Sequence, residues 1–101
     1  MKRSKDKVIR VKPIKVNDDY LRKLTEGYIN TQCAVMNADN PQDHQWSLKD
    51  FDFTWTMYPP EIGPHESEIA VISIYMFSAR GGKCFEYAQL CVMESGSWDT
   101  V

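Results

Sequence analysis

The sequence has no apolar run approaching the roughly 18 residues that a membrane-spanning helix needs, so we expect no membrane segment. The charged N-terminus is not followed by an apolar stretch, so we also expect no signal peptide. Glycine and proline number only five each among 101 residues, which excludes collagen-like and low-complexity chains. This composition is typical of one small globular domain.

Cysteine is scarce, and its number is odd: the chain has Cys33, Cys84 and Cys91. No CxxC pair or Cys/His spacing resembles a zinc site, so we expect neither a metal nor another cofactor. Cys84 and Cys91 are seven residues apart in one expected strand, which predicts that they lie on opposite faces. Free thiols in a chain without a secretory signal favour a reducing compartment, and we expect a cytoplasmic location.

Catalytic signatures are also missing. His44 and His65 lie in expected loops, and no nearby acid has a spacing that forces acid-base geometry. The chain has no nucleophile elbow, no catalytic triad motif and no glycine-rich phosphate loop. Arg80-Gly81-Gly82 is best explained as a hairpin turn, because glycine adopts a positive φ easily. We therefore expect that the protein is not an enzyme.

One amphipathic helix is expected over residues 18–36. Asn17 is a good N-cap, and the two acids that follow it favour a helix start. Apolar residues then recur at spacings of mostly three and four between Leu21 and Val35. The polar segment 37–41 ends in proline and predicts the helix stop.

Four other segments have strand patterns. The second alternates most cleanly, with Phe51, Phe53 and Trp55 on one face, and the third is apolar on both faces, as central strands are. In the fourth, strict alternation places Glu86 on the same face as Leu90. The four expected strands are residues 7–12, 51–58, 68–78 and 83–93.

The order β-α-β-β-β predicts an α+β fold, a single domain in which one helix packs on one face of an antiparallel sheet. We divide the chain into a mobile basic tail at residues 1–6, the α+β domain at residues 7–95 and a polar C-terminal tail at residues 96–101.

The charge is unevenly distributed. Residues 1–15, called the basic arm below, hold seven Lys and Arg and one acid, whereas residues 16–101 hold five bases and thirteen acids. The arm is typical of a solvated tail with a charged edge strand, but it could also bind nucleic-acid phosphates, an acidic protein or the acidic body of its own chain. The candidate nucleic-acid-binding residues are Lys2, Arg3, Lys5, Lys7, Arg10 and Lys12.

Three aromatic residues lie at the margins of the expected core, where they either fold back onto it or anchor a partner. Together with nearby acids they give our leading hypothesis, a small non-catalytic protein-binding domain. An inhibitor of the immunity type or the phage counter-defence type would place carboxylates where its target expects phosphates. The candidate protein-binding residues are Trp46, Tyr58, Trp98, Asp50, Asp52 and Glu61.

Three alternatives remain open. The first is nucleic-acid binding through the basic arm. The second is a small ligand-binding or enzymatic domain with a pocket between helix and sheet, near Tyr28, Trp55 and His65. The third is a homodimer in which the strand at residues 68–78 buries its second apolar face.

Overall fold

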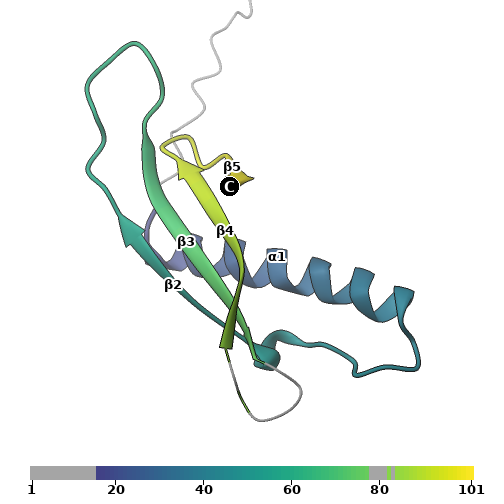
Figure 1. The fold of residues 1–101 in the computed structure, drawn as a ribbon. Coiled ribbons are helices and arrows are strands. Elements are labelled where there is room, and N and C mark those ends of the chain that lie inside the picture. The colour runs from purple at the N-terminus through teal and green to yellow at the C-terminus, as the bar shows by residue number, and fades with distance from the viewer. Residues whose placement is uncertain (1–15, 78–81, 83) are drawn as a thin grey trace, which may run out of the picture.

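A computed structural model describes residues 16–77, 82 and 84–101 of the chain (Figure 1). Its element order is helix α1 (Asp18–Asp39), the short 3-10 helix η1 (Leu48–Asp50) and strands β2 (Phe51–Met57), β3 (Glu68–Phe77), β4 (Cys84–Met93) and β5 (Trp98–Thr100). The four strands form one antiparallel sheet in the order β2-β3-β4-β5. The predicted α+β fold is confirmed, whereas the strand predicted at residues 7–12 lies outside the described residues.

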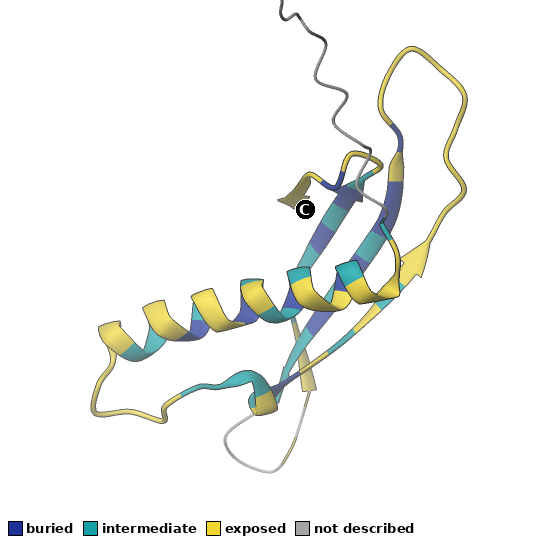
Figure 2. Cartoon of the chain, turned by 180° about the vertical axis from the view of Figure 1, so that it is seen from behind, coloured by how far each residue is buried: buried dark blue, intermediate teal, exposed yellow. Residues whose placement is uncertain are grey.

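Helix α1 begins as the sequence predicts and ends three residues later than predicted. The Asn17 side chain accepts a hydrogen bond from the amide of Tyr20 at 2.9 Å, which satisfies one of the free amides of the first turn. Leu21, Thr25, Ile29 and Cys33 form a buried stripe with a spacing of four. Thr25 is tolerated in that stripe because its hydroxyl donates to the carbonyl of Leu21 at 2.7 Å. One face of the helix therefore lies against the sheet (Figure 2).

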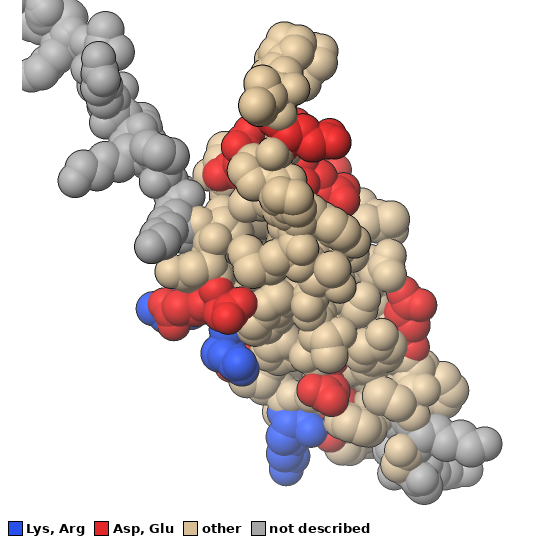
Figure 3. Space-filling model, turned by 90° about the vertical axis from the view of Figure 1, so that its left-hand side faces the viewer, with Lys and Arg blue, Asp and Glu red and all other residues tan. Residues whose placement is uncertain are grey.

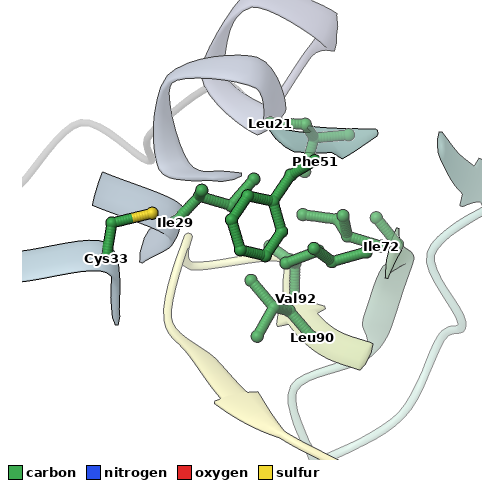
Figure 4. Packing of buried hydrophobic residues seen from close by; sticks show 9 residues of the cluster. Leu21, Ile29, Cys33, Phe51, Ile72, Leu90 and Val92 are labelled. Atoms are coloured by element: carbon green, nitrogen blue, oxygen red, sulfur yellow. The ribbon is translucent and has the colours of Figure 1, made fainter. Parts of the chain in front are cut away.

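The strand register divides the sheet into two faces. On the face toward the helix, Trp55 pairs with Ile72, which pairs with Leu90. Ile72 and Leu90 are fully buried, and they pack with Leu21, Ile29 and Phe51 in the core (Figure 4). The other face lies on the side of the sheet away from α1 (Figures 1 and 2). The helix thus covers one face of the sheet, as the element order predicts.

A register shift in β4 changes which side chains share a face. Ile74 pairs with Ala88, but Tyr75 pairs with Glu86, so Tyr87 is an extra residue in the strand. Tyr87 turns toward the helix, where its hydroxyl lies 3.2 Å from the side-chain oxygen of Gln32. Glu86 therefore lies on the face away from the helix, whereas Leu90 lies on the buried face. The prediction that these two residues share a face was wrong.

The same shift corrects the prediction for two cysteines. Cys84 pairs with Phe77 and Cys91 pairs with Val71, and these two partners are six residues apart in β3. An even separation places both partners on one face of β3, so Cys84 and Cys91 share a face as well. The prediction of opposite faces was wrong because the bulge at Tyr87 adds one residue between them.

The C-terminal residues form an edge strand where the sequence suggested a polar tail. β5 pairs with β4 through Leu90 and Thr100, Cys91 and Asp99, and Val92 and Trp98. The turn before it needs Gly96, whose φ of 94° favours glycine and whose amide donates to the carbonyl of Met93 at 2.9 Å. Gly96 also accepts a hydrogen bond from the Tyr20 hydroxyl at 2.5 Å, which joins this turn to the start of α1.

Among the described helices, none is long and apolar enough to cross a membrane.

Candidate protein-binding site

The sheet face opposite the helix is not covered by any described helix or strand (Figures 1 and 2). We call it the open face and define it by three rows of paired residues. Its central strand contributes half-buried side chains, its edges contribute exposed polar ones, and Ser73 accepts a 3.5 Å hydrogen bond from the Gln89 amide. The rows are Asp52–Tyr75–Glu86, Thr54–Ser73–Gln89 and Thr56–Val71–Cys91–Asp99.

Carboxylates stand at the margins of the open face, and the described strands carry no lysine or arginine. Arg22 of α1 lines the groove beside β2 together with Asp52. Asp52 lies on one edge strand, Asp99 on the other, and Glu86 ends the first row. The Lys and Arg residues in the described ranges, Arg22, Lys23 and Lys49, all belong to α1 or η1. Viewed from the β2 side, the blue atoms accordingly gather in one part of the surface, and red atoms lie from top to bottom (Figure 3).

Asp52 and Asp99 also protect the sheet edges. The Asp52 carboxylate accepts a hydrogen bond from the amide of Phe53 at 2.9 Å, and Asp99 accepts one from the amide of Thr100 at 2.8 Å. An edge amide that is already bonded is less available to another strand, and charge at an edge opposes sheet extension. The chemistry of this surface therefore favours side-chain docking on the open face over strand addition.

The thiol of Cys91 is held in its protonated form. It donates to a carboxylate oxygen of Glu68 across 2.7 Å. The hydrogen bond to Glu68, burial and the nearby carboxylates raise the pKa of Cys91 from 9.0 to about 11. A thiol with so high a pKa is a poor nucleophile near neutral pH, so this cysteine contributes a weak donor to the open face rather than a reactive group.

Two of the sequence-predicted site residues have structural roles. Trp46 is half-buried against Phe51 with ring centroids 6.2 Å apart, and its backbone amide and carbonyl bond the side chain of Asn37 at 2.7 and 2.8 Å. Asp50 accepts the amide of Ser47 at 2.9 Å and lies 3.3 Å from the His44 ring nitrogen. These contacts hold the connection between α1 and β2 against the core.

The pKa of Asp50 follows from these contacts. Burial by itself raises the pKa, but the amide of Ser47, the hydrogen bond and charge of His44 and the charge of Lys49 lower it more. The net effect is a pKa below 3.8, so the carboxylate is ionised at neutral pH. The His44–Asp50 pair therefore behaves as a structural contact at the start of β2.

Tyr58 and Glu61 lie together, as neighbours in a recess of about 450 Å³ that is also lined by Pro59 and Glu68. The loop that contains them is tied back by Ser67, whose hydroxyl accepts the amide of Glu61 at 2.8 Å. Tyr58 is 45% exposed, and Glu61 is exposed as well. This recess adjoins the end of β2 and adds an aromatic side chain to an acidic surface.

Trp98 lies apart from the other predicted residues, on the helix side of β5. Its ring packs edge-on against Tyr28 at 5.5 Å, and it remains 44% exposed. Tyr28, Gln32 and Trp98 line a shallow groove of about 410 Å³. The structure thus separates the six predicted protein-binding residues into Trp46 with Asp50, Tyr58 with Glu61, Asp52 on the open face and Trp98 at the far edge.

The predicted helix-sheet pocket is not assembled. Trp55 lines a groove of about 440 Å³ beside β2, in which the Arg22 guanidinium lies 5.6 Å from its ring. Tyr28 lines the separate groove with Trp98, and His65 belongs to neither. Among residues 16–77, 82 and 84–101, no group of three His, Cys, Asp or Glu side chains is placed to hold a metal ion.

Sequence reasoning missed Tyr75, Glu86 and Asp99 as surface residues of one face. The even spacing of Asp52 and Thr54 was visible in the alternation of β2, but the pairing partners of these residues depend on register. No family model, curated protein or solved structure matches the chain.

Proposed function

We propose that this chain is a small, non-catalytic protein-binding domain whose open face docks on a basic surface of another protein. The observation that carries this proposal is a sheet face with half-buried Tyr75 and Val71 at its centre and carboxylates at its margins. A mixture of apolar centre and charged rim is the usual anatomy of a protein interface.

Charge complementarity selects the partner. The open face presents Asp52, Glu86 and Asp99 to a partner. The described strands carry no lysine or arginine. Such an array steers a Lys- or Arg-rich surface toward the domain and disfavours an acidic one. If that basic surface normally binds nucleic acid, the domain acts as an inhibitor, of the immunity type or the phage counter-defence type, by occupying it.

The three free cysteines are compatible with a reducing compartment, which supports our proposal of a cytoplasmic location.

Affinity purification followed by reconstitution with the purified partner tests the proposal. Glu86→Lys reverses one exposed charge of the open face, and Asp39→Lys makes the same change at the exposed end of α1. We expect the partner to have a basic surface, and we expect Glu86→Lys to weaken binding by about five-fold or more while Asp39→Lys changes it little. Equal affinities for the wild type and both variants would contradict the proposed surface.

Tyr58→Ala and Trp98→Ala locate the aromatic contribution. Both side chains are partly exposed, so their removal leaves the described core in place. A contribution from the recess next to β2 would appear as weaker binding in Tyr58→Ala, and one from β5 as weaker binding in Trp98→Ala. Trp46→Ala does not separate binding from folding, because Trp46 packs on the core.

Nucleic-acid binding through the basic arm is the second candidate, because seven Lys and Arg occur within fifteen residues. Neutralising phosphates with these charges would give an affinity that falls steeply with salt. A gel shift at low salt that is lost when residues 2–12 are deleted would support this candidate. The absence of any shift by the full chain at low salt would exclude it.

A further inference from the structure

The open face has a candidate occupant within the chain itself. The arm at residues 1–15 carries seven bases and one acid, whereas the remaining residues carry five bases and thirteen acids. The arm also contains Val8, Ile9 and Val11, which are apolar side chains of the kind that cover a half-buried Tyr75 or Val71. Its composition therefore complements the open face in charge and in hydrophobicity.

The arm is attached at the end of the sheet. The Asp18 carboxylate accepts a hydrogen bond from the Trp55 indole at 2.9 Å, and the Tyr20 hydroxyl bonds the turn between β4 and β5. These two contacts fix the start of α1 beside the ends of β2 and β4, which border the open face.

The arm is long enough to cover this face. Fifteen extended residues span up to about 50 Å, and the ten-residue strand β3 spans about 33 Å. A tethered segment also has an effective concentration in the millimolar range, so weak charge contacts suffice to keep it bound. Reach and local concentration both favour contact within one molecule over contact between molecules.

We infer that residues 1–15 dock on the open face of their own chain. This inference rests on the binding surface proposed above and adds its regulation: a basic partner must displace the arm before it reaches Asp52, Glu86 and Asp99. The arm then acts as a tethered competitor that excludes weakly basic surfaces and admits only those that bind more tightly than it does.

Limited trypsin digestion of the full chain tests this inference without any partner, because trypsin cuts after lysine and arginine unless proline follows, and the arm holds six such sites. Mass spectrometry follows the first cut in the arm at low salt. The proteins compared are the wild type, Glu86→Lys, the matched reversal Asp39→Lys and a synthetic peptide of residues 1–15.

We expect the arm of the wild type and of Asp39→Lys to be cut about five-fold or more slowly than the peptide, and Glu86→Lys to approach the peptide rate. The difference between variants should vanish at about 0.5 M salt, where exposed charges are screened. Asp52→Asn combined with Asp99→Asn gives a second test that introduces no new base. Circular dichroism confirms that each variant is folded.

Equal cutting rates for the wild type and the peptide would overturn the inference. Protection that increases with protein concentration would also overturn it, because the occupant would then be the arm of a second copy. The proposed function is tested by a different measurement. It would be wrong if a purified basic partner bound the wild type and Glu86→Lys equally well. A protected arm without partner binding, or partner binding with a freely cut arm, therefore identifies which idea is wrong.

Discussion

The fully buried side chains under α1 hold the helix and the sheet together. Ile72 is the central example, because it pairs with Trp55 on one side and Leu90 on the other and has no exposed surface. We expect Ile72→Ala to lower the free energy of unfolding by about 2–5 kcal/mol, since it removes buried methylene groups and leaves a cavity. Urea denaturation followed by circular dichroism measures this change.

Ile62 supplies the matched control for this substitution. Its side chain is fully exposed in the loop between β2 and β3, so Ile62→Ala makes the same chemical change without opening a cavity. We expect a change within about 0.5 kcal/mol. Similar losses in the two variants would mean that Ile72 does not lie in the core.

Cys91 permits a chemical prediction. Because its pKa is raised to about 11, only about one thiol in a thousand is ionised near pH 8. We expect iodoacetamide to modify the exposed Cys84 well before Cys91, as read by peptide mass spectrometry. Glu68→Gln removes the charge of the hydrogen-bonded carboxylate and should speed the modification of Cys91, while leaving Cys84 unchanged. Faster modification of Cys91 than of Cys84 in the wild type would contradict the contact with Glu68.

The same contact has a consequence for stability at alkaline pH. The folded state holds the thiol proton more tightly than the unfolded chain, whose thiol titrates at 9.0. The contribution of Cys91 is therefore fully present below pH 9.0 and is lost as the pH rises toward about 11.

At the scale of elements, helix α1 depends on its first turn. Asn17→Ala removes the side chain that accepts the amide of Tyr20, and we expect it to cost about 1 kcal/mol of stability. Asn30→Ala is the matched control, because Asn30 is exposed within α1 and alanine is the better helix former. Thermal denaturation should show a lower melting temperature for Asn17→Ala and an equal or higher one for Asn30→Ala. The reverse order would argue against the cap.

Helices and strands that follow from a local sequence pattern were predictable. Features that depend on which strands pair, and in which register, were not. The alternation of Phe51, Phe53 and Trp55 identified β2, and the apolar spacing with an Asn17 cap identified α1. The bulge at Tyr87 depends on which residues β3 offers as partners, and no local pattern in β4 contains that information. The second apolar face of residues 68–78 was expected, but the full membership of the open face was not, because it joins residues from four strands.

The scattering of the predicted site residues has a related cause. Trp46 and Trp98 both stand in polar sequence, but Trp46 is drawn to the core by the hydrogen bonds of Asn37 and Trp98 is held at the edge by pairing with Val92. Asn37 lies in α1 and Val92 in β4, so each contact joins a tryptophan to a different element and depends on the tertiary fold. A solvent-exposed tryptophan therefore cannot be recognised from its neighbours in the sequence alone.

At the scale of the whole molecule, charge decides how copies of the chain meet. Two open faces brought together would place Asp52, Glu86 and Asp99 of both copies in one interface, with no described lysine or arginine from either sheet. Like charges at close range oppose such a contact, and water screens them only in part. The open face is therefore better suited to a basic partner than to a second copy, although a homodimer would bury Tyr75 and Val71 equally well.

We accordingly expect the full chain to be monomeric in sedimentation equilibrium near physiological salt. Replacing Asp52, Glu86 and Asp99 by Asn, Gln and Asn removes the repulsion while it retains size and polarity, so this triple variant should self-associate more than the wild type. The matched triple variant at Asp19, Asp39 and Asp43, which are exposed and outside the sheet, should remain monomeric. A wild-type dimer that dissociates when Tyr75 is replaced by Asp would instead show that the open face binds a second copy, and the arm would then have to be located elsewhere.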